Sequence, residues 1–346
     1  MKMESNASSP QLPDESEAVT VTDVARLAKV SVSTVSRILN GTARVSADKR
    51  SAVEAAIRTL SFKPNQFARG LKMGTTMTVG VVTQDIESPF FTRVMKGVEE
   101  ALSKAGYALF IVSGHWDAHE EEDRIRLLAA RRVDGIVIIT GRLEEHALRA
   151  LAQRQPIVVA GRDMEAHNVR SVCYDQEYGG FLATRYLISM GHRRIAFITG
   201  VKDHPDAQRR YAGYCRALQE AGLHSEDVLV QQGDFTESGG VLAMTRLLDS
   251  QEHFTAVFAA NDQTALGARM VLHRRGIRVP DDISLVGFDD LPAAAFQTPP
   301  LTTVRQPLFE MGAYCGETLL RMLGNNVPER ELPGLELVVR DTVRRI

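Results

Sequence analysis

The residues best suited to recognition chemistry form one short run near the amino terminus, from Ser31 to Arg37. Hydroxyl groups bond phosphate or a base edge, a guanidinium forks onto guanine with two donors, and valine contacts the methyl group of thymine. On a helix, Val35 would point inward with Ile38 and Leu39. The candidates for contact are therefore Ser31, Val32, Ser33, Thr34, Ser36 and Arg37.

Three short helices would position this run. Thr20 with Asp23 forms a capping-box-like start, and Asn40-Gly41 is a usual helix end. A second helix begins at Ser31, so soon after the first that the connection must be a tight turn. Ser46 begins a third helix, whose apolar face braces the other two. This arrangement predicts a DNA-binding helix-turn-helix; the alternative is a small helical bundle with ordinary polar positions.

The distribution of charge favours DNA binding over the plain bundle. Residues 18–74 carry ten Lys or Arg against three Asp or Glu, a net charge of +7. Residues 1–17 sum to −3 and residues 75–346 to −6, so the formal net charge of −2 hides a basic module joined to an acidic body. Such a compact basic module is the electrostatic footprint of phosphate binding.

The run Thr20–Asn40 resembles the headpiece of the lactose-repressor (LacI/GalR) family of bacterial transcription regulators. The resemblance continues through Val45-Ser46, Phe62–Asn65 and Ala68–Leu71, and it covers about residues 19–346. The further DNA contacts that it implies are Thr20, Asn40, Asn65, Ala68, Arg69 and Leu71.

The same resemblance implies that Gln66–Lys72 is a hinge helix, ordered when two protomers place it in the minor groove. There Leu71 would wedge between base pairs, as apolar side chains do when they kink a duplex. Without the resemblance this segment is a linker, because Gly70 weakens a helix that is already too short to be stable alone.

From Thr78 the hydrophobic pattern changes to short apolar runs that alternate with helical stretches. β-Branched runs between amphipathic helices predict parallel sheets wrapped by helices, and there are too many units for one sheet. We therefore predict an α/β core of two similar subdomains, with crossovers at about 163–178 and 299–307. The resemblance implies a bilobed, periplasmic-binding-protein-like core of two Rossmann-like subdomains, in which Leu308–Leu323 rejoins the first lobe and Leu335–Val339 forms a last strand.

These expectations divide the chain into four parts. They are a disordered acidic tail over 1–18, a helix-turn-helix headpiece over 19–64, a hinge helix and linker over 65–76, and an effector-binding and dimerisation core over 77–346. Within the core we expect a first lobe of about 77–176 and 306–334, and a second of about 177–305 and 335–346.

A ligand would sit between the lobes, because ligands of open α/β sheets bind beyond the carboxyl ends of the strands. Aromatic rings at these ends stack on sugar rings or bases, while amide, carboxylate and guanidinium groups bond hydroxyls or carboxylates. The candidates are Phe90, Phe91, Arg142, Arg162, His204, Asp206, Arg210, Phe235, Asn261 and Asp289.

The resemblance gives several of these candidates a role. It makes Phe90 and Phe91 stacking residues, Arg210 the arginine that clamps the effector, Phe235 a ring-facing aromatic, and Asn261 and Asp289 hydroxyl-binding residues. Arg142, Arg162 and His204 would make the pocket cationic, which favours a sugar acid or a phosphorylated sugar. A purine is the alternative, although the run Val201–Asp206 lacks the arginine of the purine-responsive branch.

We therefore predict a cytoplasmic, homodimeric transcription regulator, a repressor, that binds a pseudo-palindromic double-stranded operator and is controlled by a small effector. Segments near Phe91–Gly106 and Leu308–Leu323 are expected to supply much of the dimer contact. Whether the effector releases DNA or acts as a corepressor stays open.

Other functions are less favoured. The sequence has no nucleophile elbow, Walker loop or metal-ligand spacing, so we expect no enzyme activity, no cofactor and no metal. Three widely spaced cysteines indicate a reducing compartment, and no segment has the apolar length of a signal peptide or a membrane span. A receptor for small solutes would share the bilobed core but would have no use for the headpiece.

Overall fold

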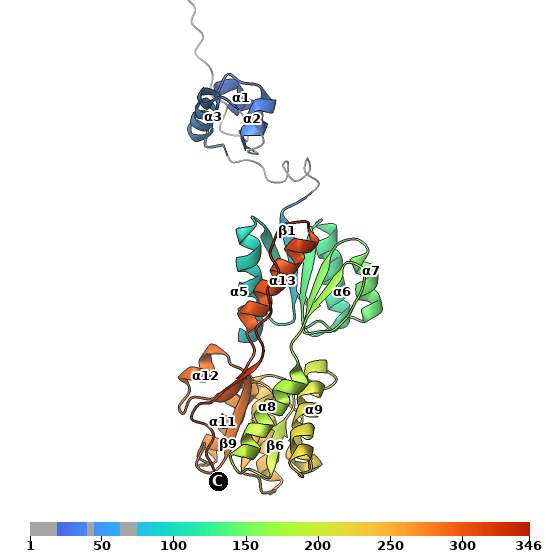
Figure 1. Ribbon diagram of the computed structural model, residues 1–346, viewed down its shortest axis with the longest axis vertical. Coiled ribbons are helices and arrows are strands. Elements are labelled where there is room, and N and C mark those ends of the chain that lie inside the picture. The colour runs from blue at the N-terminus through green and yellow to red at the C-terminus, as the bar shows by residue number, and fades with distance from the viewer. Residues whose placement is uncertain (1–18, 40–44, 63–74) are drawn as a thin grey trace, which may run out of the picture. The chain divides into compact units, whose positions relative to one another are not determined.

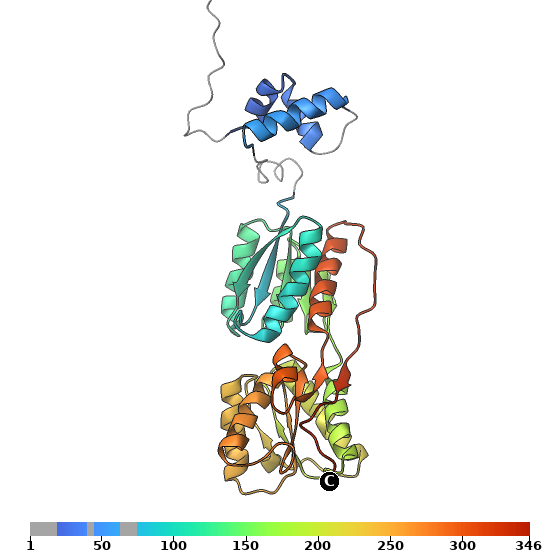
Figure 2. The ribbon, with the colours of Figure 1, turned by 90° about the vertical axis from the view of Figure 1, so that its left-hand side faces the viewer.

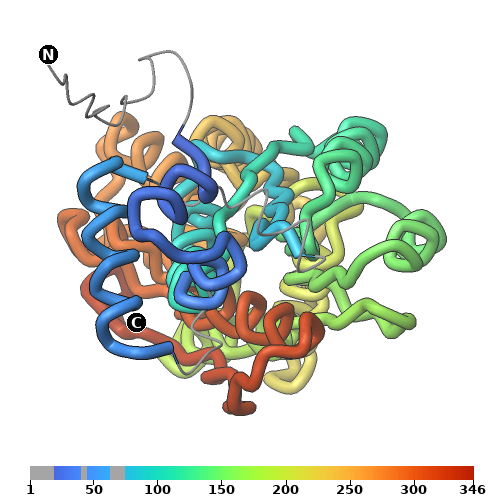
Figure 3. The backbone as a smooth tube through the Cα atoms, turned by 90° about the horizontal axis from the view of Figure 1, so that it is seen from above, coloured from blue at the N-terminus to red at the C-terminus, as the bar shows by residue number. Residues whose placement is uncertain are grey.

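The computed structural model describes residues 19–39, 45–62 and 75–346, the coloured parts of the trace in Figure 3. The chain divides into two compact units, Met1–Thr76 and Met77–Ile346. Each unit has its own hydrophobic core.

The first unit is a three-helix headpiece of α1 (Val21–Leu27), α2 (Val32–Leu39) and α3 (Ala47–Thr59). Fully buried valines from all three helices, Val24, Val35 and Val53, meet at its centre. Before α1, the backbone N–H of Thr20 donates to the carboxylate of Asp23 at 3.0 Å. Lys29 has a positive φ of 52°, which closes the tight turn between α1 and α2. The predicted helix-turn-helix is therefore confirmed.

The first lobe of the core is a five-stranded parallel sheet in the order β2-β1-β3-β4-β5. Its strands are β1 (Thr78–Thr83), β2 (Ala108–Ser113), β3 (Gly135–Ile139), β4 (Ile157–Ala160) and β5 (Val169–Val172). Its helices are α5 (Pro89–Lys104), α6 (Ala118–Ala130), α7 (Glu145–Ala152) and α13 (Leu308–Met322). Both faces of the sheet are covered, as parallel sheets require.

The second lobe is a six-stranded sheet in the order β11-β10-β9-β8-β6-β7, in which only β11 runs antiparallel. Its strands are β6 (Ile195–Ile198), β7 (Val230–Gln231), β8 (Ala256–Ala259), β9 (Ser284–Asp289), β10 (Thr302–Arg305) and β11 (Glu336–Val338). Its helices are α8 (Gln176–Ser189), α9 (Pro205–Glu220), the 3-10 turn η1 (Asp227–Leu229), α10 (Glu237–Asp249), α11 (Asp262–Arg274) and α12 (Pro292–Phe296).

Alternation along the strands explains how each sheet supports helices on both faces. In β1, Val79 and Val81 pack with α5 and α13, whereas Val82 packs with α6 and α7. In β6, Ile198 joins the cluster under α10 and α11, whereas Phe197 joins the one under α8 and α9. Successive side chains of a strand point to opposite faces, so fully apolar strands build two clusters per sheet. The predicted two-subdomain α/β core is confirmed.

The chain passes between the lobes after β5, after β10 and after α13 (Figures 1 and 2). The last of these passages runs back along the first lobe and ends at β11, close to the last strand expected over Leu335–Val339. The expected crossovers at 163–178 and 299–307 each contain one of these passages, and each also holds a strand that was not expected. β5 forms an edge of the first sheet, and β10 lies between β9 and β11.

Three helix pairs are brought together by glycines that face each other across the contact. A Cβ on Gly97 or Gly312 would lie about 2 Å from a backbone carbonyl of the partner helix in the pair α5–α13. Gly180 and Gly213 do the same for α8–α9, and Gly240 and Gly267 for α10–α11. The backbones of each pair are therefore in direct contact, and the pair α8–α9 positions groups that face the space between the lobes.

Gly213→Ala should lower the thermal stability of the core. The new methyl group would lie 2.0 Å from the carbonyl oxygen of Glu177 and 2.6 Å from the backbone nitrogen of Phe181. Backbone atoms cannot rotate away, so α8 and α9 must separate, at a cost of about 1–3 kcal/mol. Calorimetry of the full chain measures the change. Gly334→Ala is the control, because its Cβ meets nothing within 4 Å; equal shifts for the two variants would contradict this account.

Candidate functional site

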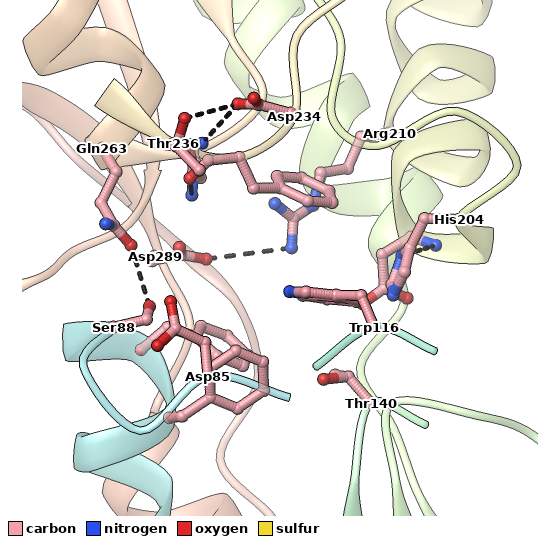
Figure 4. A pocket seen from close by; sticks show the side chains of 15 residues that line it. Asp85, Ser88, Trp116, Thr140, His204, Arg210, Asp234, Thr236, Gln263 and Asp289 are labelled. Atoms are coloured by element: carbon pink, nitrogen blue, oxygen red, sulfur yellow. Dashed lines mark hydrogen bonds and ion pairs between the residues drawn. The ribbon is translucent and has the colours of Figure 1, made fainter. Parts of the chain in front are cut away.

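A pocket opens between the lobes, where the carboxyl ends of β1, β2, β3, β6, β8 and β9 face one another (Figure 4). This is the location that open α/β sheets give to their ligands. The residues that line the pocket are Asp85, Ser88, Phe90, Phe91, Trp116, Thr140, His204, Asp206, Arg210, Asp234, Phe235, Thr236, Asn261, Gln263 and Asp289.

Much of the polar lining consists of residues that begin helices. Ser88, His204, Thr236 and Asn261 are the N-caps of α5, α9, α10 and α11. The Asn261 carboxamide oxygen accepts the backbone N–H of Thr264 at 2.9 Å, and its amide donates to the Phe235 carbonyl at 2.9 Å. Strand-to-helix turns therefore supply polar groups at the cleft, and His204, Thr236 and Asn261 also cap their own helices, whereas the Ser88 hydroxyl donates to Gln263.

A series of aromatic rings crosses from one lobe to the other. In the first lobe, Phe90 packs on Phe91 with ring centroids 5.1 Å apart, and Phe91 packs on Trp116 at 5.9 Å. Trp116 then meets His204 of the second lobe edge-on at 5.4 Å, and His204 meets Phe235 at 5.6 Å. These rings give the pocket apolar walls that suit the flat faces of a ligand.

Four buried polar side chains form a closed ring beside the pocket. The Arg210 Nε donates to Gln176 at 2.9 Å, and the Gln176 amide donates to Gln306 at 2.8 Å. The Gln306 amide donates to Asp289 at 2.7 Å, and Asp289 lies 3.8 Å from an Arg210 Nη. Gln176 lies at the start of α8, after β5, and Gln306 comes directly after β10. The ring therefore links the pocket to the two passages between the lobes that follow these strands.

The guanidinium of Arg210 is held from several sides. It donates to the Ala260 carbonyl and lies over the Phe288 ring, with Cζ 3.8 Å from the centroid. Arg210 and Asp289 are only 3% and 2% exposed, so each charge depends on the other for compensation.

Burial shapes the titration of the groups around the pocket. It lowers the pKa of His204 to about 4, with the charges of Arg210, Arg142 and Arg162 adding to the effect, so this imidazole is neutral at pH 7. It raises the pKa of Asp206, and it raises the pKa of Asp289 to about 6 although Arg210 opposes the change. The lining thus holds four carboxyl groups, on Asp85, Asp206, Asp234 and Asp289, and a single guanidinium.

Of the ten side chains expected from the sequence, the structure brings eight together at the pocket. Arg142 and Arg162 are not among the lining residues. Arg142 is exposed, and Arg162 donates to the backbone carbonyls of Leu143 and Gly141, so it supports a loop. The two arginines therefore stay outside the lining, although their charges help to lower the pKa of His204.

Seven of the lining residues are not among the ten candidates named from the sequence. They are Asp85, Ser88, Trp116, Thr140, Asp234, Thr236 and Gln263. Trp116, the only tryptophan of the chain, is three residues past the end of β2, in a segment where the strand-end rule places pocket residues. Gln263 gave no such signal, because it lies on α11 and reaches the other lobe only through its hydrogen bond to Ser88 at 3.0 Å.

In the headpiece, the side chains of α2 divide as the pattern predicts. Val35 is buried, whereas Val32, Ser33 and Arg37 are exposed. Ser31 caps the helix: its hydroxyl accepts the backbone N–H of Thr34 at 3.2 Å and lies 2.8 Å from the hydroxyl of that residue. Ser36 is half-buried, and Thr20 precedes α1. The expected contacts that lie outside the described residues are Asn40, Asn65, Ala68, Arg69 and Leu71.

Comparison with known proteins gives two family matches. Residues 20–65 match the family described as bacterial regulatory proteins, lacI family, and residues 76–332 match periplasmic binding proteins and sugar binding domain of LacI family. The chain belongs to the LacI family. It is a DNA-binding transcriptional regulator with an effector-binding core.

Individual LacI-family proteins resemble the chain over nearly its whole length. The chain is 39% identical to the transcriptional regulator GalR of Escherichia coli (strain K12), with 94% of each chain covered. It is 35% identical to the transcriptional repressor PurR of Aliivibrio salmonicida, over 94% of this chain and 99% of that one.

Solved structures show the same relationship. A lac repressor dimer bound to operator and the anti-inducer ONPF matches with a TM-score of 0.84 and 28% identity, covering 95% and 100% of the two chains. A complex of the transcriptional regulator CelR with cellobiose matches with a TM-score of 0.69 and 36% identity, covering 94% and 99%. Within the part of this chain that the structure describes, no helix has the length and hydropathy needed to cross a membrane.

Asp289→Asn should remove a pH dependence from the stability of this LacI-family core. Because burial raises the pKa of Asp289 from 3.8 to about 6, the folded state holds a proton between these values that the unfolded chain has released. The carboxyl thus stabilises the fold at acidic pH, and this contribution is lost as the pH rises through about 6. Asparagine does not titrate.

The variant's free energy of unfolding, relative to the parent's, should therefore rise by about 2 kcal/mol between about pH 4.5 and about pH 7.5, at about 1.4 kcal/mol per pH unit. Urea titrations at the two pH values measure it. Asp282→Asn is the control, since Arg278 lowers the pKa of Asp282 to about 2, below this window. A relative stability that stays level or falls with pH would refute the assignment.

Proposed function

We propose that the chain is a homodimeric repressor whose effector is a neutral carbohydrate held between the lobes of the core. The observation that carries the choice of ligand is the charge of the pocket: its only guanidinium, on Arg210, is compensated by Asp289, and three further carboxyl groups face the same space. The lining thus holds more carboxyl groups than cations, which favours an uncharged polyol over the sugar acid suggested by the sequence.

The aromatic walls support the same class of ligand. Phe91, Trp116 and Phe235 present apolar rings, while Asp206 and Asp289 offer oxygen acceptors for hydroxyl groups. The complex of CelR with cellobiose, at 36% identity, adds a neutral sugar in a similar protein. Purines are the second candidate, because a nucleobase would also stack on these rings and the PurR relatives are 35% identical.

The headpiece supports binding to DNA through α2. Its exposed Val32, Ser33 and Arg37 form a short apolar and donor-bearing edge of the size that enters a major groove. Two headpieces on one pseudo-palindromic operator require a homodimer. A lac repressor dimer bound to operator is among the similar solved structures. A cytoplasmic, non-enzymatic role follows from this function.

The surface that would form the dimer differs from the first expectation. The apolar side of α13 is already used within the protomer, against α5 and the first sheet. In contrast, Phe110 and Ile111 on the edge strand β2 are 43% and 48% exposed, and Leu127 on α6 is 44% exposed. An exposed apolar edge strand is a ready surface for pairing between chains, so we assign the first-lobe contact to β2.

Neutral sugars should bind the full-length protein, and acidic ones should not. Titration with cellobiose, ribose, gluconate, glucose 6-phosphate and hypoxanthine, followed by Trp116 fluorescence, tests this. Asp289→Asn should weaken the binding of the effective sugar at least about tenfold, since the amide loses the charged acceptor. Arg142→Ala is the control and should bind as the parent does. Binding of gluconate alone would reject the neutral-sugar proposal, and binding of hypoxanthine alone would favour a purine.

Arg37→Ala should weaken specific DNA binding by about 1–3 kcal/mol, the value of one guanidinium fork on a base pair. Fluorescence anisotropy with duplexes from upstream of its own gene measures this, with random duplexes as the reference for non-specific binding. Lys104→Ala is the control, because this exposed lysine lies on α5, outside the headpiece, and pairs with Glu100 of the same helix. An equal loss on specific and random duplexes would mean that Arg37 contacts phosphate and does not read a base.

A further inference from the structure

A carboxyl group lies beneath the first-lobe wall of the pocket and does not line it. Glu121, in the first turn of α6, is fully buried. Its Oε2 accepts the backbone N–H of Arg142 at 2.7 Å and the side-chain amide of Gln84 at 3.3 Å. Its Oε1 has no hydrogen-bond partner among the described residues. Burying a carboxyl group so incompletely satisfied costs stability, so its position calls for an explanation.

Two loops of the pocket wall pass close to Glu121, and each has a glycine at the crossing: Gly141 meets the carboxyl group, and Gly114 meets the base of the side chain. A Cβ on Gly141 would lie 2.2 Å from the Glu121 Oε1, and a Cβ on Gly114 would lie 3.2 Å from the Glu121 Cβ. A side chain at Gly141 would displace the carboxyl group, and one at Gly114 would require a shift of a few tenths of an ångström. The loops 113–117 and 140–143 therefore pack closely against Glu121 at Gly114 and Gly141.

The same two loops contain backbone conformations that need external support. His115, Trp116 and Thr140 have positive φ values of 50°, 59° and 51°. Such conformations are costly for residues with a Cβ and persist where the surroundings over-determine them. Two of the three, Trp116 and Thr140, line the pocket. The strain is thus located where the wall presents its groups to the ligand.

Hydrogen bonds connect Glu121 to both strained loops. Gln84, which bonds Glu121 through its amide nitrogen, accepts the backbone N–H of Trp116 through its Oε1 at 3.0 Å. On the other side, the bond from the Arg142 N–H fixes the loop that begins at Thr140. Arg162 holds that loop from outside through the carbonyls of Gly141 and Leu143.

We propose that Glu121 is a positioning residue for the pocket: it fixes the orientation of Trp116 through Gln84 and the loop of Thr140 through the Arg142 N–H. It does not touch the ligand. That these loops bind an effector rests on the proposed function, whereas the positioning of Trp116 does not. Burial raises the pKa of Glu121, and the oxygen that accepts both bonds is present equally in glutamine. A glutamine at position 121 should therefore preserve the positions of the two loops, whereas an alanine should not.

Trp116 reports on this arrangement because it is the only tryptophan of the chain. The experiment compares emission spectra and acrylamide quenching of the full-length parent, Glu121→Ala, Glu121→Gln and Leu128→Ala. Leu128 is the control for loosened packing of α6, since it is 2% exposed on the same helix and packs on Gly80. In Glu121→Ala we expect red-shifted emission and quenching raised about twofold, as the strained loop relaxes into solvent. Glu121→Gln and Leu128→Ala should match the parent.

A second variant, Gln84→Met, keeps the test decisive if Glu121→Ala does not fold. It removes the acceptor of the Trp116 N–H while retaining the length of the side chain, and it should give the same spectral change. For cellobiose, or ribose if only that sugar binds the parent, the Kd should rise at least about tenfold in Glu121→Ala and stay at the parental value in Glu121→Gln.

The outcomes separate the two proposals. Unchanged Trp116 fluorescence in folded Glu121→Ala and in Gln84→Met would overturn the positioning role, as would an equal change in Leu128→Ala. A change in Glu121→Gln as large as in Glu121→Ala would overturn the hydrogen-bond account. If Trp116 responds as expected but no sugar binds the parent, the positioning role stands and the proposed effector class fails.

Discussion

The bilobed core depends on one constraint above all: a charge buried between the lobes must be compensated from several chain segments at once. Arg210 reaches this position because Gly180 and Gly213 bring α8 and α9 into backbone contact, which sets Gln176 at 2.9 Å from its Nε. Gln306 and Asp289 complete the ring. A partly satisfied buried network is worse than an apolar core, so the ring ties both crossovers to a single arrangement of the pocket.

This constraint also underlies the ligand class that we propose for the pocket. Since Arg210 is already paired, it offers little free positive charge, and the remaining charged groups of the lining are carboxyls. His204 adds a ring without a charge, because burial lowers its pKa to about 4. Hydroxyl-rich neutral ligands satisfy such acceptors without adding like charge, whereas acidic ligands do not. The site therefore joins aromatic surface to hydrogen-bond acceptors.

The first-lobe wall of the pocket contains strained backbone, and a buried side chain beneath the wall supports it. The wall presents Trp116 and Thr140 from left-handed backbone, and a buried Glu121 below them holds the two loops. The headpiece is built differently. Its small apolar core leaves the basic and hydroxyl side chains of α2 at the surface, where they face water until DNA replaces it. The core thus places its polar and aromatic groups in a cleft, whereas the headpiece exposes the polar side chains of α2 at its surface.

The sequence by itself determined the headpiece, the alternation of strands and helices, and the strand ends at which a pocket would form. These follow from local rules: periodicity and capping act over a few residues, and strand ends in a parallel sheet meet at one edge. Only the tertiary structure decided that Arg162 supports a loop while Arg210 faces the pocket. Arg162 follows the end of β4 and Arg210 lies on α9, and their roles depend on which carbonyls and carboxylates the fold brings within reach. It likewise added Gln263 and Glu121, whose partners are far away in the sequence.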